Sequence, residues 1–156
     1  MEGKTPSQSA VEMTELVLPN DTNLLGNLLG GRLMHWIDIA GAIAASRHSN
    51  RIAATVALDS LDFRLPIRVG ELVILKAKIT WTGNTSMEVV VNVYGENTRT
   101  GEVRLTNKAY LTYVALDENG RPTPVPPIIP ETEEEKRDFL EGELRRKERL
   151  QRIKER

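Results

Sequence analysis

The apolar residues of the chain follow two different periods, one helical and one alternating. Between Arg32 and about Arg47 they recur at three- and four-residue spacing, and small or apolar residues also fill most of the other helix faces. A helix that is apolar nearly all round is a buried one, because protein must cover every face. The sequence therefore predicts a long central helix enclosed by other elements.

Strand patterns occupy most of the remaining chain. A short one covers Val11–Leu18, and Ile52–Asp59 follows the helix with an alternation that predicts a mostly buried strand. The residues that share one face of that second strand are Ile52, Ala54, Val56 and Leu58. Three longer segments then alternate between tight turns: 73–81, 87–94 and Val103–Leu116. An antiparallel sheet that wraps one hydrophobic helix satisfies all of these faces, which predicts an α+β fold.

The two ends of the chain differ from this body. The first ten residues are polar and are expected to form a flexible N-terminus, residues 1–10. Pro122–Pro130 contains five prolines and cannot join a sheet centrally, so we expect an extended strap that ends the globular domain, residues 11–130. Residues 131–156 form a charged helical extension, acidic in its first half and basic in its second, as the helix dipole favours. Its thin apolar stripe predicts that it lies on the body or on a neighbouring subunit; the stripe is Phe139, Leu140, Leu144, Leu150 and Ile153.

Composition narrows the class of protein. Hydrophobic residues make up 40% of the 156 residues and charged residues 28%, with a net charge of −1, which is typical of a globular chain without a basic nucleic-acid-binding face. The longest apolar stretch is too short and too charged to span a bilayer, and Met1–Ala10 lacks a leader pattern. There is no cysteine, which excludes disulfides and thiolates and agrees with a cytoplasmic location. His35 and His48 are the only histidines, so we expect no metal site.

Two polar side chains and a glycine pair are candidates for chemistry. Asp38 lies in the apolar helix, where an unpaired carboxylate is costly; alone, it would more often cap backbone or pair with a neighbour. Asn23 can orient water or donate to a carbonyl, or simply close an Asx-turn. Gly30 and Gly31 can bring backbone N–H groups close to an oxyanion, or form a plain turn. No nucleophile motif accompanies His35, whereas His48 is expected to be a cationic partner of the helix C-terminus.

The run PNDTNLLGNLLGGRLMHWID, from Pro19 to Asp38, resembles the signature of the acyl-CoA hydrolase family, thioesterases with the hotdog fold. The resemblance covers residues 11–127, most of the globular part. It continues through separate blocks in the same order: 40–45, 47–50, 55–63, 84–89 and 109–114.

This resemblance implies a curved antiparallel sheet around a central helix and subunits that pair into homodimers and further into a hexamer, a trimer of dimers. It implies that Asn23 of one subunit and Asp38 of the other form the active site. Asp38 would act as general base or as nucleophile, and Asn23 would orient water or polarise the thioester. The pantetheine arm of the acyl-CoA substrate would contact two segments, Val56, Ala57, Leu58 and Thr85, Ser86, Met87. CoA is then part of substrate and product, and no cofactor is expected.

Two other functions remain open on the same scaffold. A hydroxyacyl-thioester dehydratase usually needs a histidine placed for proton abstraction, and the pair Asn23 and Asp38 favours hydrolysis instead. A non-catalytic acyl-CoA-binding or regulatory protein is the second alternative, because a fold alone does not determine function.

Overall fold

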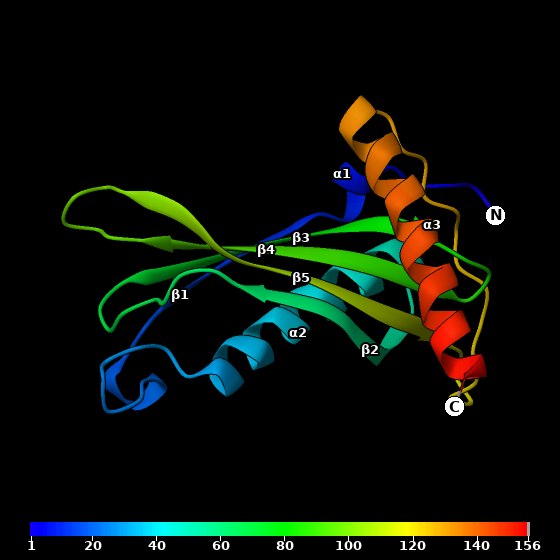
Figure 1. Cartoon of the computed structure of the whole chain (residues 1–156). Helices are drawn as coiled ribbons and strands as arrows, with labels where there is room; N and C mark the ends of the chain where they lie inside the picture. The colour runs from blue at the N-terminus through cyan, green and yellow to red at the C-terminus, as the bar shows by residue number, and fades with distance from the viewer. Residues whose placement is uncertain (156) are drawn as a thin grey trace.

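A five-stranded antiparallel sheet curves around a long helix in the computed structural model, which describes residues 1–155 apart from the side chain of Phe63 (Figure 1). The strands stand in the order β1-β3-β4-β5-β2. Their bounds are β1 Val11–Leu16, β2 Ile52–Phe63, β3 Leu72–Thr82, β4 Ser86–Glu96 and β5 Val103–Leu116. The helices are α1 Pro6–Ser9, η1 Pro19–Asp21, α2 Gly30–Ser49 and α3 Glu133–Lys154. The predicted architecture, an antiparallel sheet wrapped around one helix, is confirmed.

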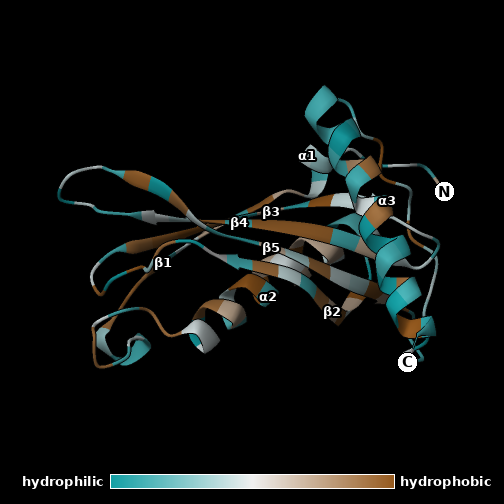
Figure 2. Ribbon diagram, viewed as in Figure 1, coloured by the Kyte–Doolittle hydropathy of each residue, from teal (hydrophilic) through white to brown (hydrophobic). Residues whose placement is uncertain are grey.

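Helix α2 packs one face against the sheet and leaves another uncovered. Ile37, Ala40 and Ala44 are fully buried there, and Figure 2 shows hydrophobic stretches on both α2 and the central strands. However, Met34 is 43% exposed and Ile39 is 37% exposed. The prediction of a helix buried all round is therefore wrong for the single chain, because the sheet reaches only one side of it. Among the described helices, none is long and apolar enough to cross a membrane.

Strand β2 is an edge strand with two irregularities. The register against β5 shifts between Thr55 and Ala57 and again between Leu58 and Ser60. Each bulge inserts an extra residue and interrupts the alternation of side chains between the two faces. The expectation that β2 is mostly buried is therefore wrong: Val56 is 59% exposed and Leu58 is 40% exposed.

The chain termini are tied to the body. The Lys4 ammonium donates to the Asn50 Oδ1 at 2.6 Å, and the Lys4 backbone bonds to Pro127 at 3.0 Å. These bonds place the first residues against the end of α2 and against the strap, and the flexibility of residues 1–10 stays a prediction. The strap after β5 behaves as predicted, since the Val125 N–H bonds to the Asn84 carbonyl at 2.9 Å instead of joining the sheet centrally.

Helix α3 lies across the outer face of the sheet, opposite α2 (Figure 1). The predicted helix is confirmed, but only part of its apolar stripe makes the contact: Phe139 packs against the core, whereas Leu140 is 63% exposed and Leu144 is 58% exposed. Arginines also dock on the sheet, and Arg145 forms a two-bonded ion pair with Glu88, which is only 3% exposed. Gly142 permits the close approach, because a Cβ there would lie 2.9 Å from Glu88. Helix α3 is therefore oriented by ion pairs, in which arginines on one side of it contact buried acidic groups on the outer face of the sheet.

Candidate active site

Asp38 is held from two strands at the middle of α2. The Thr55 hydroxyl donates to the Asp38 Oδ1 at 2.7 Å, and the Tyr113 hydroxyl lies 2.9 Å from the same oxygen and 3.0 Å from the Asp38 carbonyl. Burial, followed by the bond to Asp38, raises the pKa of Tyr113 well above its ordinary value of 10.0. The phenol therefore stays protonated and acts as a donor. Both interactions converge on Oδ1, and the second carboxylate oxygen, Oδ2, has no hydrogen-bond partner among the described residues.

The register of the sheet brings these hydroxyls together. Thr55 of β2 stands directly opposite Tyr113 of β5, so both reach the carboxylate from adjacent positions. Gly41 makes room on the helix side, because a Cβ at that position would collide with the Tyr113 hydroxyl. The carboxylate is thus fixed by the backbone geometry of three elements.

An apolar cavity of about 180 Å³ opens beside Asp38. Thr55, Leu58 and Leu61 all line it from β2, although a regular strand would not place residues three apart on one face. The bulges of β2 account for this spacing, since each one shifts the phase of the alternation. The remaining lining residues are Met34, Ile37 and Leu111. The arrangement offers a carboxylate oxygen to a group held in an apolar environment.

The single chain does not bring Asn23 into this cavity. Asn23 is exposed, and its Oδ1 accepts from the backbone N–H groups of Leu25 at 2.9 Å and Asn27 at 3.1 Å. The Asx-turn considered from the sequence is therefore present. It also orients the carboxamide, and its Nδ2 makes no hydrogen bond within the described chain. Asn23 can therefore donate to a group outside its own fold.

The two segments predicted to contact pantetheine both lie under helix α3. Val56, Ala57 and Leu58 line a groove of about 480 Å³ together with Arg149 and Arg152 of α3. Arg149 is held by Asp59 at 3.1 Å, whereas Arg152 is exposed.

The second predicted segment begins β4. Ser86 accepts a hydrogen bond from Arg146 at 3.1 Å, Thr85 is partly exposed, and Met87 is fully buried in the core. Only the first two could present side chains to a ligand without repacking. The predicted roles of both segments stay predictions.

The remaining candidates divide between the surface and the interior. Gly30 and Gly31 begin α2 without a side-chain cap, so their N–H groups are available to a ligand. His35 is exposed and does not line the Asp38 cavity. His48 is fully buried; its Nε2 donates to the Pro126 carbonyl at 2.6 Å, and burial lowers its pKa below 6.5. The prediction of a cationic His48 is therefore wrong, because the strap removes the ring from water. The described residues contain no cluster of three or more metal-ligating side chains.

Sequence reasoning missed Thr55 and Tyr113 as site residues. Both were assigned to strands, and a hydroxyl on a strand carries no signal of its own. The available clue was Gly41, a small residue within the helix beside Asp38, which indicates a close approach. Only the strand register identifies what approaches.

Known proteins resemble this chain in both sequence and structure. Residues 25–102 match the model of the thioesterase superfamily. An uncharacterized acyl-CoA thioester hydrolase of Bacillus subtilis is 48% identical over 82% of this chain and 74% of its own length. The structure matches an apo-hexameric acyl-CoA thioesterase with a TM-score of 0.95 and 42% identity, covering 98% of both chains. An acyl-CoA hydrolase of Staphylococcus aureus, solved with butyryl-CoA and CoA, matches with a TM-score of 0.91 and 36% identity over 97% of this chain and 93% of its own.

Variants of the Staphylococcus aureus enzyme have also been solved, with an aspartate, an asparagine or a threonine replaced by alanine. In that enzyme the asparagine precedes the aspartate by 15 residues and the threonine follows it by 17. Asn23, Asp38 and Thr55 have the same spacing. The two residues that the sequence singled out, and the threonine that it missed, thus coincide in spacing with three positions tested in a relative.

Proposed function

The chain belongs to the thioesterase superfamily and is an acyl-CoA thioester hydrolase, and on that premise we propose that Asp38 performs the hydrolysis together with Asn23 of a partner subunit. One observation carries this proposal. The Asp38 Oδ1 is held by Thr55 and Tyr113, while Oδ2 is left for chemistry beside an apolar cavity. A carboxylate fixed in this way is pre-organised for proton abstraction or attack.

The reaction needs a nucleophile, a polarised carbonyl and a leaving thiolate. In one route Asp38 removes a proton from water, the hydroxide adds to the thioester carbon, and the C–S bond breaks to give the acid and CoA thiolate. In the other, Oδ2 attacks the thioester carbon directly, CoA thiolate leaves, and water then hydrolyses the resulting anhydride. Both routes need donors at the carbonyl oxygen, which the Asn23 Nδ2 and the free N–H groups of Gly30 and Gly31, all from the partner subunit, can supply.

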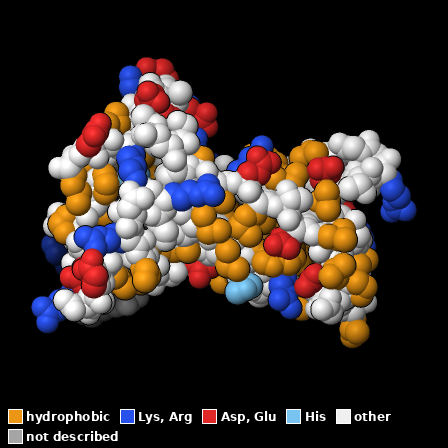
Figure 3. Space-filling model, turned by 180° about the vertical axis from the view of Figure 1, so that it is seen from behind, with side chains coloured by type: hydrophobic (Ala, Val, Ile, Leu, Met, Phe, Trp, Pro, Cys, Tyr) orange, Lys and Arg blue, Asp and Glu red, His pale blue; other side chains and the backbone are white. Residues whose placement is uncertain are grey.

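The surfaces of the single chain favour assembly. Strand β2 leaves one backbone edge unpaired, and the exposed apolar residues Val56 and Leu58 lie on it. The uncovered face of α2, with Met34 and Ile39, adds to this surface. Hydrophobic side chains gather across the middle of one face of the molecule (Figure 3). A homodimer would cover such a surface and would complete the site with Asn23. A hexamer, as in the apo-hexameric relative, is the assembly that we propose.

The groove under α3 supplies the opposite chemistry to the apolar cavity. Arg152 is exposed beside Val56 and Leu58, and Leu58 also lines the Asp38 cavity. An acyl-CoA with its thioester at Asp38 would therefore have its CoA part near the positive charge of Arg152, which suits the phosphates of CoA. We expect Arg152→Ala to raise KM for acyl-CoA with little change in kcat.

Thiol release from butyryl-CoA tests the activity. Asp38→Asn and Asn23→Ala should each lower turnover by about 10²-fold or more without unfolding, since each removes a group that acts on the reacting atoms. Binding of acyl-CoA without any thiol release by the wild type would instead indicate a non-catalytic binding protein. Because the proposed chemistry uses no metal, a chelator should leave turnover unchanged.

Mixing the two inactive variants tests the shared site. If Asn23 and Asp38 act across a twofold interface, a dimer with one chain of each kind contains one intact site. About one quarter of wild-type activity should then return at equal mixing. No recovery, with mixed dimers verified by mass, would place both residues in one subunit. Single-turnover hydrolysis in heavy-oxygen water separates the two routes where water opens the anhydride at the Asp38 carbonyl: the label then enters the Asp38 carboxylate, whereas the general-base route puts it only into the product acid.

A further inference from the structure

Asn107 is a buried polar residue that the proposed mechanism does not use. It faces the inside of the sheet from β5 and is 1% exposed. Neither its Oδ1 nor its Nδ2 has a hydrogen-bond partner among the described residues. A carboxamide offers up to four hydrogen bonds, and an unpaired buried polar group is rare enough to need an explanation.

A small cavity accounts for the position of Asn107. It has a volume of about 60 Å³, enough for about two water molecules or a small polar group. Gly30, the first residue of α2, also lines it, and that helix start has no side-chain cap. The other lining residues are apolar: Leu28, Leu33, Leu65, Pro66 and Ile67. The cavity therefore combines an apolar wall with a donor and an acceptor from Asn107.

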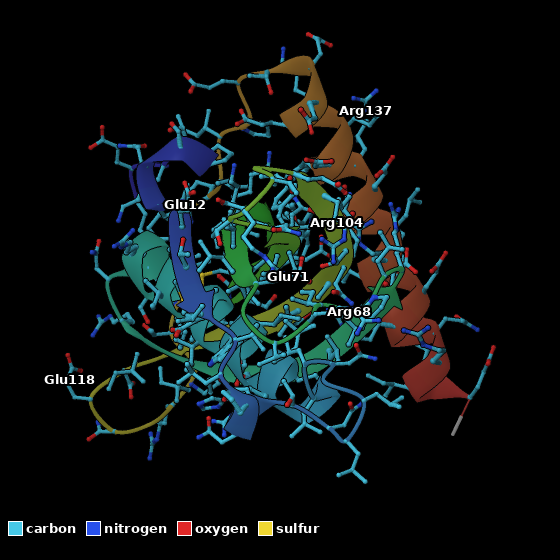
Figure 4. The ribbon with its side chains drawn as sticks, turned by 90° about the vertical axis from the view of Figure 1, so that its left-hand side faces the viewer. Glu12, Arg68, Glu71, Arg104, Glu118 and Arg137 are labelled. Atoms are coloured by element: carbon cyan, nitrogen blue, oxygen red, sulfur yellow. The ribbon has the colours of Figure 1, made fainter. Side chains whose placement is uncertain are left out.

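The wall of this cavity is rigidly held. Arg104 donates to the Pro66 carbonyl at 3.0 Å and forms an ion pair with Glu71 at 3.0 Å (Figure 4). The bond from Arg104 lowers the pKa of Glu71, so the pair stays charged near neutral pH. The Leu28 N–H bonds to the Ile67 carbonyl at 2.7 Å. These bonds fix the loop between β2 and β3 over Asn107.

The Asn107 cavity lies in line with the Asp38 cavity. Three elements run from one to the other, each contributing lining residues to both. The residues, from the Asp38 end to the Asn107 end, are Asp38, Met34 and Gly30 of α2, Leu111 and Asn107 of β5, and Leu58, Leu61 and Leu65 of β2 and the loop after it. Ala109, between Leu111 and Asn107 on β5, has the small side chain that a chain passing between the cavities requires.

The separation of the two cavities sets a length. It is about 12 Å along α2 from Asp38 to Gly30 at 1.5 Å per residue, and about 13 Å along β5 from Leu111 to Asn107 at about 3.3 Å per residue. An extended alkyl chain advances roughly 1.3 Å for each C–C bond of about 1.5 Å. An acyl chain of about ten or eleven carbon atoms, with its thioester at Asp38, would thus end at Asn107.

We propose that the Asn107 cavity binds a hydrogen-bonding group, a hydroxyl or a carbonyl, at the far end of the substrate's acyl chain. The proposal rests on the acyl-CoA hydrolase activity and assigns Asn107 as a residue that determines specificity. A terminal hydroxyl or carbonyl pairs with the carboxamide, whereas a terminal methyl leaves both of its polar atoms unpaired. For acyl chains too short to reach Asn107, the enzyme does not distinguish a terminal hydroxyl from a terminal methyl.

The test compares acyl-CoA substrates with their ω-hydroxy counterparts from four to sixteen carbons. In the wild type, we expect kcat/KM to favour the ω-hydroxy substrate by about tenfold or more at the length that reaches Asn107, and equal values for four carbons. Asn107→Leu should reverse this preference. Asn107→Ala is the second variant, because its smaller side chain fits without repacking. Asn92→Leu, the same substitution in strand β4 at a partly exposed position, is the control and should behave as the wild type.

Binding to the Asp38→Asn variant, measured by calorimetry, gives a second readout that needs no turnover. A tighter ω-hydroxy ligand at one chain length, lost with Asn107→Ala, supports the proposal. Equal affinities and equal kcat/KM at every length, unchanged by both Asn107 variants, would overturn it. Failure of the wild type to release thiol from any acyl-CoA of the four-to-sixteen-carbon series would instead refute the hydrolase activity itself, while the affinities still decide whether Asn107 binds the end of the acyl chain.

Discussion

Replacing Tyr113 with Phe removes one hydroxyl from behind the proposed catalytic carboxylate. The hydroxyl lies 2.9 Å from the Asp38 Oδ1 and 3.0 Å from the Asp38 carbonyl oxygen. Tyr113 is fully buried, and Phe has nearly the same shape, so the core should remain packed. The variant therefore tests whether the position of the Asp38 carboxylate matters, separately from its presence.

The size of the effect follows from the geometry. A hydrogen bond to a charged group contributes about 1.5–3 kcal/mol. The single hydroxyl hydrogen of Tyr113 is shared between two acceptors, and Thr55 still donates to the same carboxylate oxygen. The lower end of the range then applies, about 1.5–2 kcal/mol, or a tenfold to thirtyfold fall in kcat/KM.

The assay is thiol release from butyryl-CoA between pH 5 and 9, with wild type, Tyr113→Phe and Tyr94→Phe measured together. Tyr94 lies on β4, is partly exposed and makes no contact with Asp38, so its variant should match the wild type. The loss of kcat/KM in the double variant Thr55→Val, Tyr113→Phe should differ from the sum of the losses in the two single variants, because both hydroxyls donate to the same carboxylate oxygen. An unchanged kcat/KM across this pH range in Tyr113→Phe would refute the positioning role.

Three further predictions concern stability. Gly41→Ala should lower the melting temperature and the activity, although alanine favours helices by about 1 kcal/mol, because its Cβ collides with the Tyr113 hydroxyl. Arg145→Ala should reduce the free energy of unfolding in denaturant by about 3–5 kcal/mol, because it strands the buried carboxylate of Glu88. Acid should destabilise the fold below pH 6.5, by up to about 1.4 kcal/mol per pH unit, because the unfolded chain protonates His48 more readily than the folded one.

Matched variants make these outcomes decisive. Arg51→Ala breaks the exposed pair with Glu118 and should cost much less stability, so an equal loss for Arg145→Ala would contradict the role of burial. His48→Gln keeps a donor for the Pro126 carbonyl and should flatten the loss of stability in acid. An unchanged pH dependence in that variant would show that other groups cause it. A Gly41→Ala protein with a higher melting temperature would show that Tyr113 can move aside at no cost.

The elements of the fold followed from local patterns. The helix around Ala40, the long strands and the strap each have a periodicity or a proline content that few other structures satisfy, and all were found. Asp38 drew attention as a carboxylate in an apolar helix, although that position alone more often indicates a structural partner, and the resemblance to the acyl-CoA hydrolase signature made it a catalytic candidate. These features depend on neighbours in the sequence, and the sequence displays them directly.

The surroundings of the site were not recoverable in this way. The bulges of β2 exposed Val56 and turned Leu61 toward the cavity, against the simple alternation. Helix α3 docks through the ion pair of Arg145 with the buried Glu88, while most of its apolar stripe stays exposed. Each outcome depends on a partner far along the chain, and the pattern of one segment carries no information about that partner.

The sequence by itself determined that a helix bearing Asp38 is enclosed by a sheet, and that Asn23 precedes it in a polar turn. The tertiary structure decided what holds Asp38: Thr55 and Tyr113 meet it because β2 and β5 pair in one particular register. Register is a long-range choice, set by how the core packs and where the bulges fall. A one-residue slip of β2 against β5 would turn the Thr55 hydroxyl to the other face, and the carboxylate would lose that support while every local pattern stayed the same.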